Sequence, residues 1–173
     1  MKELQTGRLL LRRLRREDVP RIFSCWASDP AVTKYLTWQP HESEETTHKI
    51  MDLWLAAYDK PETRRYGIEL KDSGELIGMI DVVQIANGEP VIGYCSGRAY
   101  WGNGYMTEAL RALCDALFEE GYPSIYIEAV DENTGSNRVI QKAGFSFVGS
   151  RVHTPPAGEK SPVTLNCYRL KRA

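Results

Sequence analysis

The feature that most constrains this chain is a glycine-containing segment that joins an apolar strand to a long amphipathic helix. Residues Tyr100 to Thr107 read Tyr-Trp-Gly-Asn-Gly-Tyr-Met-Thr. They follow a strand pattern at Val91 to Cys95, and a helical repeat of apolar residues begins at Tyr105 and closes at Gly121. A second apolar strand pattern follows at Ser124 to Val130. Strand, long helix and strand predict a β-α-β unit with two parallel, adjacent strands and a right-handed crossover.

The rest of the chain predicts short helices and antiparallel strands. Helices are expected at Glu17 to Trp26, Asp29 to Tyr35, Ser43 to Tyr58 and Ser136 to Lys142. Strands are expected from Leu9, at Arg65 to Leu70, Glu75 to Val83, Phe145 to Val152 and Val163 to Leu170, with a turn at Asn87 to Pro90 and a loop at His153 to Pro162. We therefore expect one α/β domain over residues 1–173, with a mixed, mostly antiparallel sheet and helices on both faces.

The composition excludes several classes of protein. Lysine and arginine number 22 against 23 aspartate and glutamate, so the net charge of −1 indicates neither a nucleic-acid binder nor an acidic tail. The four cysteines form no C-x-x-C pair or Cys/His cluster, which argues against a disulfide or zinc framework. The start of the chain is polar, and no apolar stretch approaches the ~18 residues of a membrane helix. We expect a soluble, cytoplasmic protein without a metal ion.

Arginines crowd the first strand and the turn after it. They are Arg8, Arg12, Arg13, Arg15, Arg16 and Arg21. One interpretation is a solvated edge whose arginine stems lie on apolar surface. The other is attraction of an anionic cofactor or substrate.

The segment from Tyr100 to Thr107 has the properties of an anion site. Glycines let the backbone turn sharply, and the start of a helix supplies unpaired N–H groups and the positive end of its dipole. By itself this pattern also fits a plain tight turn. No third glycine follows Gly104 at the spacing of a dinucleotide fingerprint, because that position is Thr107, and no Gly-Lys-Ser/Thr occurs. Any phosphate bound here therefore belongs to another class of ligand.

Three ordered blocks of the chain resemble one protein family. The first block consists of Ile92-Gly-Tyr94 and Trp101 to Leu110. The second block runs from Asn133 to Phe145 and is followed by Gly149. The third is the N-terminal block from Arg8 through Tyr35-Leu. Together they resemble the RimJ/RimL-like branch of the GNAT superfamily of N-acetyltransferases. The resemblance covers essentially the whole chain and implies that the parallel strand pair is splayed.

The resemblance implies a site for acetyl-CoA. In the family, main-chain N–H groups of the glycine loop hold the CoA pyrophosphate, and pantetheine lies in the gap between the splayed strands. The residues that match the pyrophosphate loop are Gly102, Asn103, Gly104, Tyr105, Met106 and Thr107. Those that match the pantetheine strand and the opposite wall are Ile92, Gly93, Tyr94, Asn133 and Asn137. Met106 departs from the small residue that is usual at its position.

The implied reaction is direct attack of an amine on the thioester, which needs a base for the ammonium proton and a donor for the departing thiolate. Ser136 matches the family position of that donor, and helix capping is its alternative role. The base is left open, because relatives often carry Glu where this chain has Val91. Glu128, Glu89 and Asp81 are the candidates, with Glu128 placed first.

The acceptor is not readable from the sequence. A protein N-terminus and a small amine are equally compatible with the resemblance, and the aromatic residues Trp38, Trp54, Tyr58 and Tyr66 fit an acceptor cleft or the core. Two other functions stay open: a non-catalytic acyl-CoA-binding module, and a partner-binding domain that uses the arginine-rich edge. We expect no nucleic-acid or membrane partner, and a monomer or homodimer.

Overall fold

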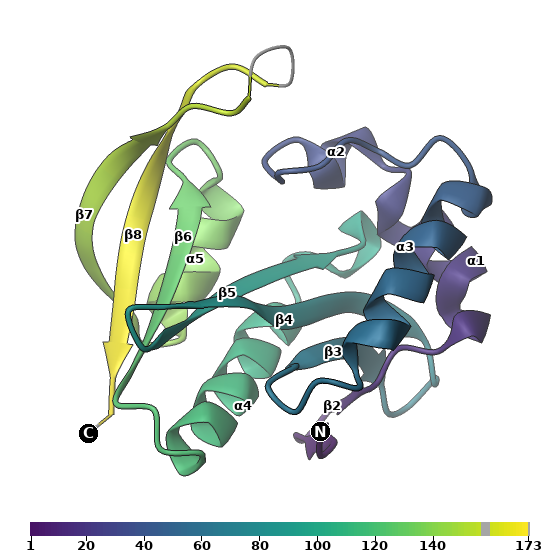
Figure 1. Ribbon diagram of the computed structural model, residues 1–173, viewed down its shortest axis with the longest axis horizontal. Coiled ribbons are helices and arrows are strands. Elements are labelled where there is room, and N and C mark those ends of the chain that lie inside the picture. The colour runs from purple at the N-terminus through teal and green to yellow at the C-terminus, as the bar shows by residue number, and fades with distance from the viewer. Residues whose placement is uncertain (157–159, 173) are drawn as a thin grey trace.

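The computed structural model describes residues 1–156 and 160–172, which build an eight-stranded sheet flanked by helices (Figure 1). In spatial order the strands are β1 (Leu4–Gln5), β2 (Leu9–Arg12), β3 (Arg65–Leu70), β4 (Leu76–Ala86), β5 (Glu89–Ser96), β6 (Ser124–Val130), β8 (Val163–Lys171) and β7 (Ser146–His153). The pair β5–β6 is parallel and the other neighbours are antiparallel. The predicted mixed, mostly antiparallel sheet is confirmed.

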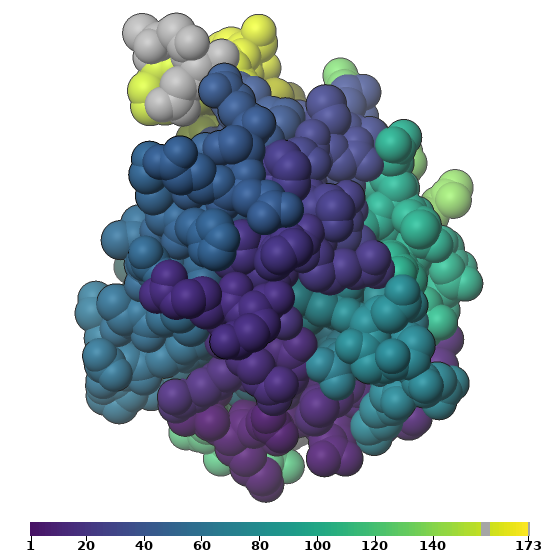
Figure 2. Space-filling model, turned by 90° about the vertical axis from the view of Figure 1, so that its right-hand side faces the viewer, coloured from purple at the N-terminus to yellow at the C-terminus, as the bar shows by residue number. Residues whose placement is uncertain are grey.

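Helices cover both faces of the sheet. They are α1 (Val19–Ile22), α2 (Pro30–Thr33), α3 (Glu44–Ala57), α4 (Tyr105–Glu119) and α5 (Thr134–Lys142). One buried cluster joins α4 and α5 to the sheet through residues such as Leu110, Ile140 and Ile92. A second cluster joins α1 and α3 to the other face through Val19, Met51 and others. Figure 2 shows this second side, where the N-terminal half of the chain, coloured purple to blue, forms most of the surface.

None of the described helices is long and apolar enough to cross a membrane.

Helix α4 forms because its apolar residues recur on one face. Ala109, Leu110, Leu113 and Leu117 are fully or almost fully buried against the sheet, and each buried leucine contributes roughly 1.5–3 kcal/mol of burial free energy. The helix ends where Gly121 takes a φ of 100° and the N–H of the next residue bonds back to the carbonyl of Leu117. This amphipathic face fixes α4 against the sheet.

The parallel pair separates soon after it forms. Its register joins Val91 to Tyr126 and Ile92 to Ile127, and no later residue of β5 pairs with β6. From there β5 continues to Ser96, while β6 runs on beside β8. The two strands diverge toward the end of the molecule where α2 lies (Figure 1). The splayed pair implied by the family resemblance is therefore present.

The N-terminal helix differs from the prediction of one continuous helix over Glu17 to Trp26. The segment consists of a 3₁₀ turn at Arg16–Asp18, then α1, then a π-helical turn at Phe23–Ala27. The wider turn forms because the main-chain N–H and the hydroxyl of Ser28 both bond to the carbonyl oxygen of Phe23, at 3.1 and 2.7 Å.

The hairpin of β4 and β5 is longer than predicted. A two-residue turn at Asn87 and Gly88, both with positive φ (53° and 79°), extends β4 to Ala86 and starts β5 at Glu89. The sequence prediction also missed the short strand β1. In the predicted loop at His153 to Pro162, residues 157–159 lie outside the described residues, and His153 itself is the last residue of β7.

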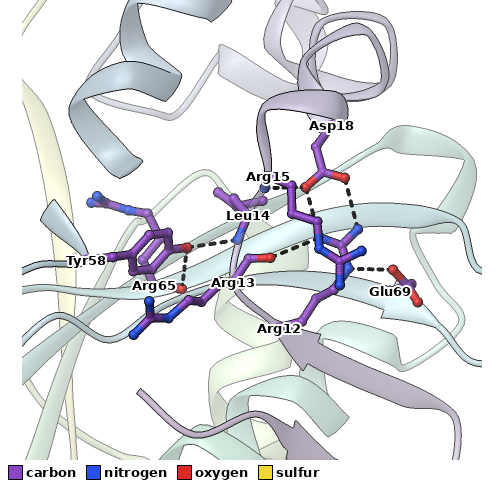
Figure 3. Close-up of polar contacts among 8 residues, drawn as sticks. All are labelled: Arg12, Arg13, Leu14, Arg15, Asp18, Tyr58, Arg65 and Glu69. Atoms are coloured by element: carbon purple, nitrogen blue, oxygen red, sulfur yellow. Dashed lines mark hydrogen bonds and ion pairs between the residues drawn. The ribbon is translucent and has the colours of Figure 1, made fainter. Parts of the chain in front are cut away.

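A buried arginine ties the first strand to its surroundings (Figure 3). The guanidinium of Arg12, in a residue 4% exposed, donates two 2.9 Å hydrogen bonds to the carboxylate of Asp18 and one of 2.5 Å to Glu69. Beside it, the Tyr58 hydroxyl accepts from the N–H of Leu14 and donates to the carbonyl of Arg65, both at 2.9 Å. The hydrogen bond to Asp18 raises the pKa of Arg12. Arg12 therefore has a structural role.

Candidate active site

The loop before α4 depends on two glycines in the left-handed region. Gly102 and Gly104 both have a φ of 77°, a conformation that costs about 1–2 kcal/mol for other residues. A Cβ at Gly102 would meet no atom within 4 Å, so the space over this part of the loop is open. The glycines give the loop its shape and leave its backbone accessible.

The main-chain donors of this loop have no partner. No N–H of residues 102–107 donates a hydrogen bond to a described residue, and no side chain caps the start of α4. Consecutive free N–H groups at a helix start, together with the positive dipole end, form a site for a phosphate group. The geometry therefore fits a pyrophosphate held by the main chain.

Arg8 supports the loop from outside. Its guanidinium donates to the carbonyl of Asn103 at 3.0 Å, pairs with Glu108 at 2.7 Å and lies 4.5 Å from the centre of the Tyr105 ring. Burial raises the pKa of Glu108, but hydrogen bonds from Thr6 and Arg8 outweigh it and the net shift is downward. Arg8 thus balances a carboxylate that would otherwise repel an anion at this helix start.

The opening between β5 and β6 begins after Ile92, on the strand that leads to this loop. Because Ile92 is the last residue of β5 that pairs with β6, Gly93 and Tyr94 pair with β4 on one edge and have no β6 partner on the edge that faces the opening. Ile92 and Tyr94 pack on the α4 side of the sheet. Gly93 points to the α1–α3 side, because it lies opposite Asp81 in the β4–β5 register.

Ser136 lies on the far wall of this opening, in the first turn of α5. The helix cap is Asn133, whose side-chain oxygen accepts from the N–H of Ser136 at 3.1 Å. The capping role considered for Ser136 is therefore taken by another residue. The Ser136 hydroxyl instead lies 2.8 Å from the hydroxyl of Tyr94, so this pair bridges α5 and β5.

The expected cofactor contact of Asn137 does not fit its surroundings. Its amide nitrogen donates to the carbonyls of Val130 and Asn133 at 2.9 and 2.8 Å. Its oxygen accepts from Tyr168 at 2.6 Å and from Asn166 at 3.2 Å. These bonds use every donor and acceptor of the buried amide, so Asn137 fixes the β6–α5 turn.

Glu128 and Glu89 both lie in ion pairs. Glu128 binds Arg151 at 2.6 Å and accepts from Tyr126 at 2.9 Å. Burial raises the pKa of Glu128, but the hydrogen bonds from Arg151 and Tyr126 outweigh it and the pKa falls below its usual value. Glu89 is bonded to Ser124 and Arg169, and the Ser124 hydroxyl leads the causes that lower its pKa. Both environments favour the ionised form and make these groups weak proton acceptors.

Comparison with known proteins identifies the family. A family model described as an acetyltransferase (GNAT) domain matches residues 8–146. The uncharacterised N-acetyltransferase YoaA of Bacillus subtilis (strain 168) is 32% identical over 149 residues, which cover 84% of each chain. This chain belongs to the GNAT acetyltransferase family.

Solved GNAT structures share the fold. A RimL ribosomal L7/L12 α-N-protein acetyltransferase in complex with coenzyme A has a TM-score of 0.84 at 21% identity, covering 98% of both chains. An acetyltransferase from Salmonella typhimurium, described as modifying the N-terminal serine of ribosomal protein L7/L12, has a TM-score of 0.82 at 20% identity. It covers 99% of this chain and 100% of its own. These neighbours match the splayed sheet over its full length.

The α2 side of this GNAT chain carries a contact that the sequence did not predict. The ammonium group of Lys160, in the segment between β7 and β8, donates to the carbonyls of Thr33 and Leu36 at 2.9 and 2.7 Å. This joins the β7–β8 end to the segment after α2, at the end toward which β5 and β6 diverge (Figure 1). No local sequence signal marks such a contact, because its partners lie more than a hundred residues apart.

The four aromatic residues considered for an acceptor cleft have several structural roles. Tyr66 is buried in the α4-side cluster, and Trp38 and Trp54 pack on the α1–α3 cluster. Trp54 also lies 5.4 Å from the guanidinium of Arg65. Within residues 1–156 and 160–172, no group of three or more His, Cys, Asp or Glu side chains is placed to hold a metal ion.

Proposed function

We propose that this protein transfers the acetyl group of acetyl-CoA to a primary amine. The observation that carries the proposal is the row of unpartnered N–H groups at residues 102–107, in the loop that follows the strand diverging from β6. Membership of the GNAT family and a full-length structural match to a relative bound to coenzyme A support this assignment.

The proposed cofactor contacts are mainly main-chain contacts. The main-chain N–H groups of residues 102–107 donate hydrogen bonds to the pyrophosphate. These residues are Gly102, Asn103, Gly104, Tyr105, Met106 and Thr107. The side chain of Met106 is buried in the core, so its size does not obstruct the loop. Beyond Ile92, the last residue of β5 paired with β6, Gly93 and Tyr94 offer a free backbone edge to pantetheine, and Asn133 lies on the opposite wall.

Bound acetyl-CoA supplies a thioester carbonyl that an uncharged amine attacks. In this proposal Ser136 donates its hydroxyl proton to the departing sulfur. The Tyr94 hydroxyl, 2.8 Å away, orients the Ser136 hydroxyl. Burial raises the pKa of Tyr94, which keeps this hydroxyl protonated across the neutral range.

The acceptor is proposed at the level of its chemical class. A Salmonella typhimurium relative is described as acting on the N-terminal serine of a ribosomal protein. For this chain we propose the α-amine of a protein N-terminus or a small primary amine, since both present the same reacting group.

The test is release of CoA thiol in the presence of acetyl-CoA and a panel of amines: peptides that begin with serine, alanine or methionine, spermidine, and free amino acids. We expect turnover above buffer hydrolysis with at least one of them. Calorimetric binding of CoA without turnover on any amine would instead indicate an acyl-CoA-binding module. Absence of heat with both CoA and acetyl-CoA would reject the cofactor site altogether.

A further inference from the structure

A second carboxylate lies at the point where the sheet opens. Asp81 of β4 lies opposite Gly93 of β5, the first residue of β5 beyond the last pair with β6. Two residues along each strand, on the same face of the sheet, the pair Met79 and Cys95 packs in the cluster of α1 and α3. Because paired residues of a sheet share a face, the side chain of Asp81 lies on the face opposite α4.

The two oxygens of Asp81 have different surroundings. Oδ2 accepts both hydrogen bonds from the Arg65 guanidinium, at 2.9 and 2.7 Å. Oδ1 accepts no hydrogen bond from the described residues, and it lies 3.6 Å from where a Cβ on Gly93 would be. The same Cβ would lie 2.9 Å from Cγ1 of Val83, so the absence of a side chain at Gly93 lets both Val83 and Oδ1 lie against the opened strand. Asp81 itself is only 6% exposed.

From this juxtaposition we infer that Asp81 Oδ1 binds the ammonium group of the acceptor and takes a proton from it. This inference rests on the proposed acetyl transfer. The acceptor approaches from the α1–α3 face, while the cofactor loop lies at the start of α4. Arg65, held by Asp81 Oδ2 and the Trp54 ring, fixes the carboxylate with its free oxygen toward Gly93.

The surroundings of Asp81 suit proton transfer better than those of Glu128 or Glu89. Burial raises the pKa of Asp81, and Arg65 offsets only part of this effect. The charged or titratable groups around it are Arg65 on β3, Tyr58 directly after α3 and Cys95 on β5. Burial also raises the pKa values of Tyr58 and Cys95, so both stay neutral at neutral pH. Asp81 is then the carboxylate of this cluster, and burial makes it a better proton acceptor.

The proton balance follows from this placement. The bound ammonium gives one proton to Oδ1, which frees the nitrogen lone pair to form the C–N bond as the C–S bond breaks. The nitrogen loses its second proton to solvent, the sulfur gains the proton of Ser136, and solvent restores the serine. Asp81 then releases its proton to water. The acceptor class is an amine that is protonated in solution.

The test compares Asp81→Asn with the wild type, using the panel amine that the wild type acetylates fastest. The amide keeps the shape and still accepts from Arg65, but it cannot take a proton. We expect kcat/KM for the amine at pH 7 to fall about 10²- to 10⁴-fold, with CoA affinity unchanged by calorimetry. The loss should shrink as pH rises toward the amine pKa, because the unprotonated amine then needs no base. A structural defect would lower the rate equally at every pH.

Glu69→Gln is the matched control, since Glu69 also pairs with a strand arginine, and it should retain wild-type activity. If Asp81→Asn does not fold, Asp81→Glu retains a proton acceptor and should keep the wild-type pH profile at a lower rate. An Asp81→Asn variant with the kcat/KM and pH profile of the wild type would overturn the role of Asp81. The same conclusion would follow if Glu128→Gln, and not Asp81→Asn, lowered kcat/KM by the predicted factor. A wild type that binds CoA but acetylates no amine would reject the proposed function as well.

Discussion

The two sides of the opened sheet are built differently. On the cofactor side, the candidate contacts are main-chain groups of residues 92–94 and 102–107, within one stretch of the chain. On the acceptor side, the groups are side chains brought together from distant segments, such as Asp81 of β4, Arg65 of β3 and Lys160 beyond β7. The first site depends on backbone shape and the second on tertiary packing.

This difference has a consequence for substitution. A substitution changes a main-chain site only where the new side chain alters the backbone conformation or blocks the ligand from the backbone. The glycines are therefore the positions most sensitive to substitution. A side-chain site is sensitive at each polar residue. We therefore expect changes on the cofactor side to alter CoA affinity, and changes on the acceptor side to alter amine kinetics at unchanged CoA affinity.

Among three further substitutions, the largest effect is expected for Gly104→Val. A β-branched residue at a φ of 77° shifts the loop and removes main-chain bonds to phosphate, each worth about 1.5–3 kcal/mol. Loss of two such bonds lowers CoA affinity at least about 100-fold, measured by calorimetry. Gly74→Val is the matched control, since Gly74 has a φ of 72° in the β3–β4 turn. If both variants fold and bind CoA equally well, the loop is not the cofactor site.

A smaller effect, on rate alone, is expected for Ser136→Ala. Removal of the proton donor should lower kcat about 100-fold, at the low end for general acid catalysis, because a thiolate leaves readily. CoA affinity should change less than about twofold, since the cap of α5 is Asn133. Thr134→Ala, an exposed change on the same helix, serves as the control. An unchanged kcat in steady-state thiol release would remove Ser136 from the mechanism.

The smallest effect is expected for Lys160→Met. Its bonds to the carbonyls of Thr33 and Leu36 order the end of the molecule beside the acceptor side. Their loss should raise KM for the amine by about tenfold at most, the equivalent of about 1.4 kcal/mol, because Lys160 affects the amine only through the order of this segment. Lys71→Met, which removes a lysine bond to the carbonyl of Thr6, is the control. If Lys160→Met changed the affinity for CoA and left KM for the amine unchanged, the separation of the cofactor side from the acceptor side would be contradicted.

The same division explains how much the sequence predicted. The β-α-β unit and the glycine loop depend on local pattern: Gly102, Gly104 and the apolar repeat of α4 are adjacent in the chain. The segment Phe23–Ala27 was mispredicted because one Ser28 contact decides its turn, and pattern does not encode that contact.

Side-chain partners set the environments of the candidate site residues. Asn137 was expected at the cofactor, yet Tyr168 and Asn166, both on β8, occupy its oxygen. Glu128 was placed first as the base, but Arg151, which lies on β7, lowers its pKa. Arg8 and Arg12 look alike in sequence, but one supports the loop and the other is buried beside Asp18. Each outcome depends on a residue from another element.

The most direct test of the central claim compares calorimetric binding of CoA and pantetheine to the wild-type protein. If the free N–H groups of residues 102–107 hold the pyrophosphate, CoA binds with one site per chain and pantetheine at least about 100-fold more weakly, the equivalent of about 2.8 kcal/mol. Equal affinity for the two ligands, or no binding of CoA, would contradict a pyrophosphate site at the start of α4.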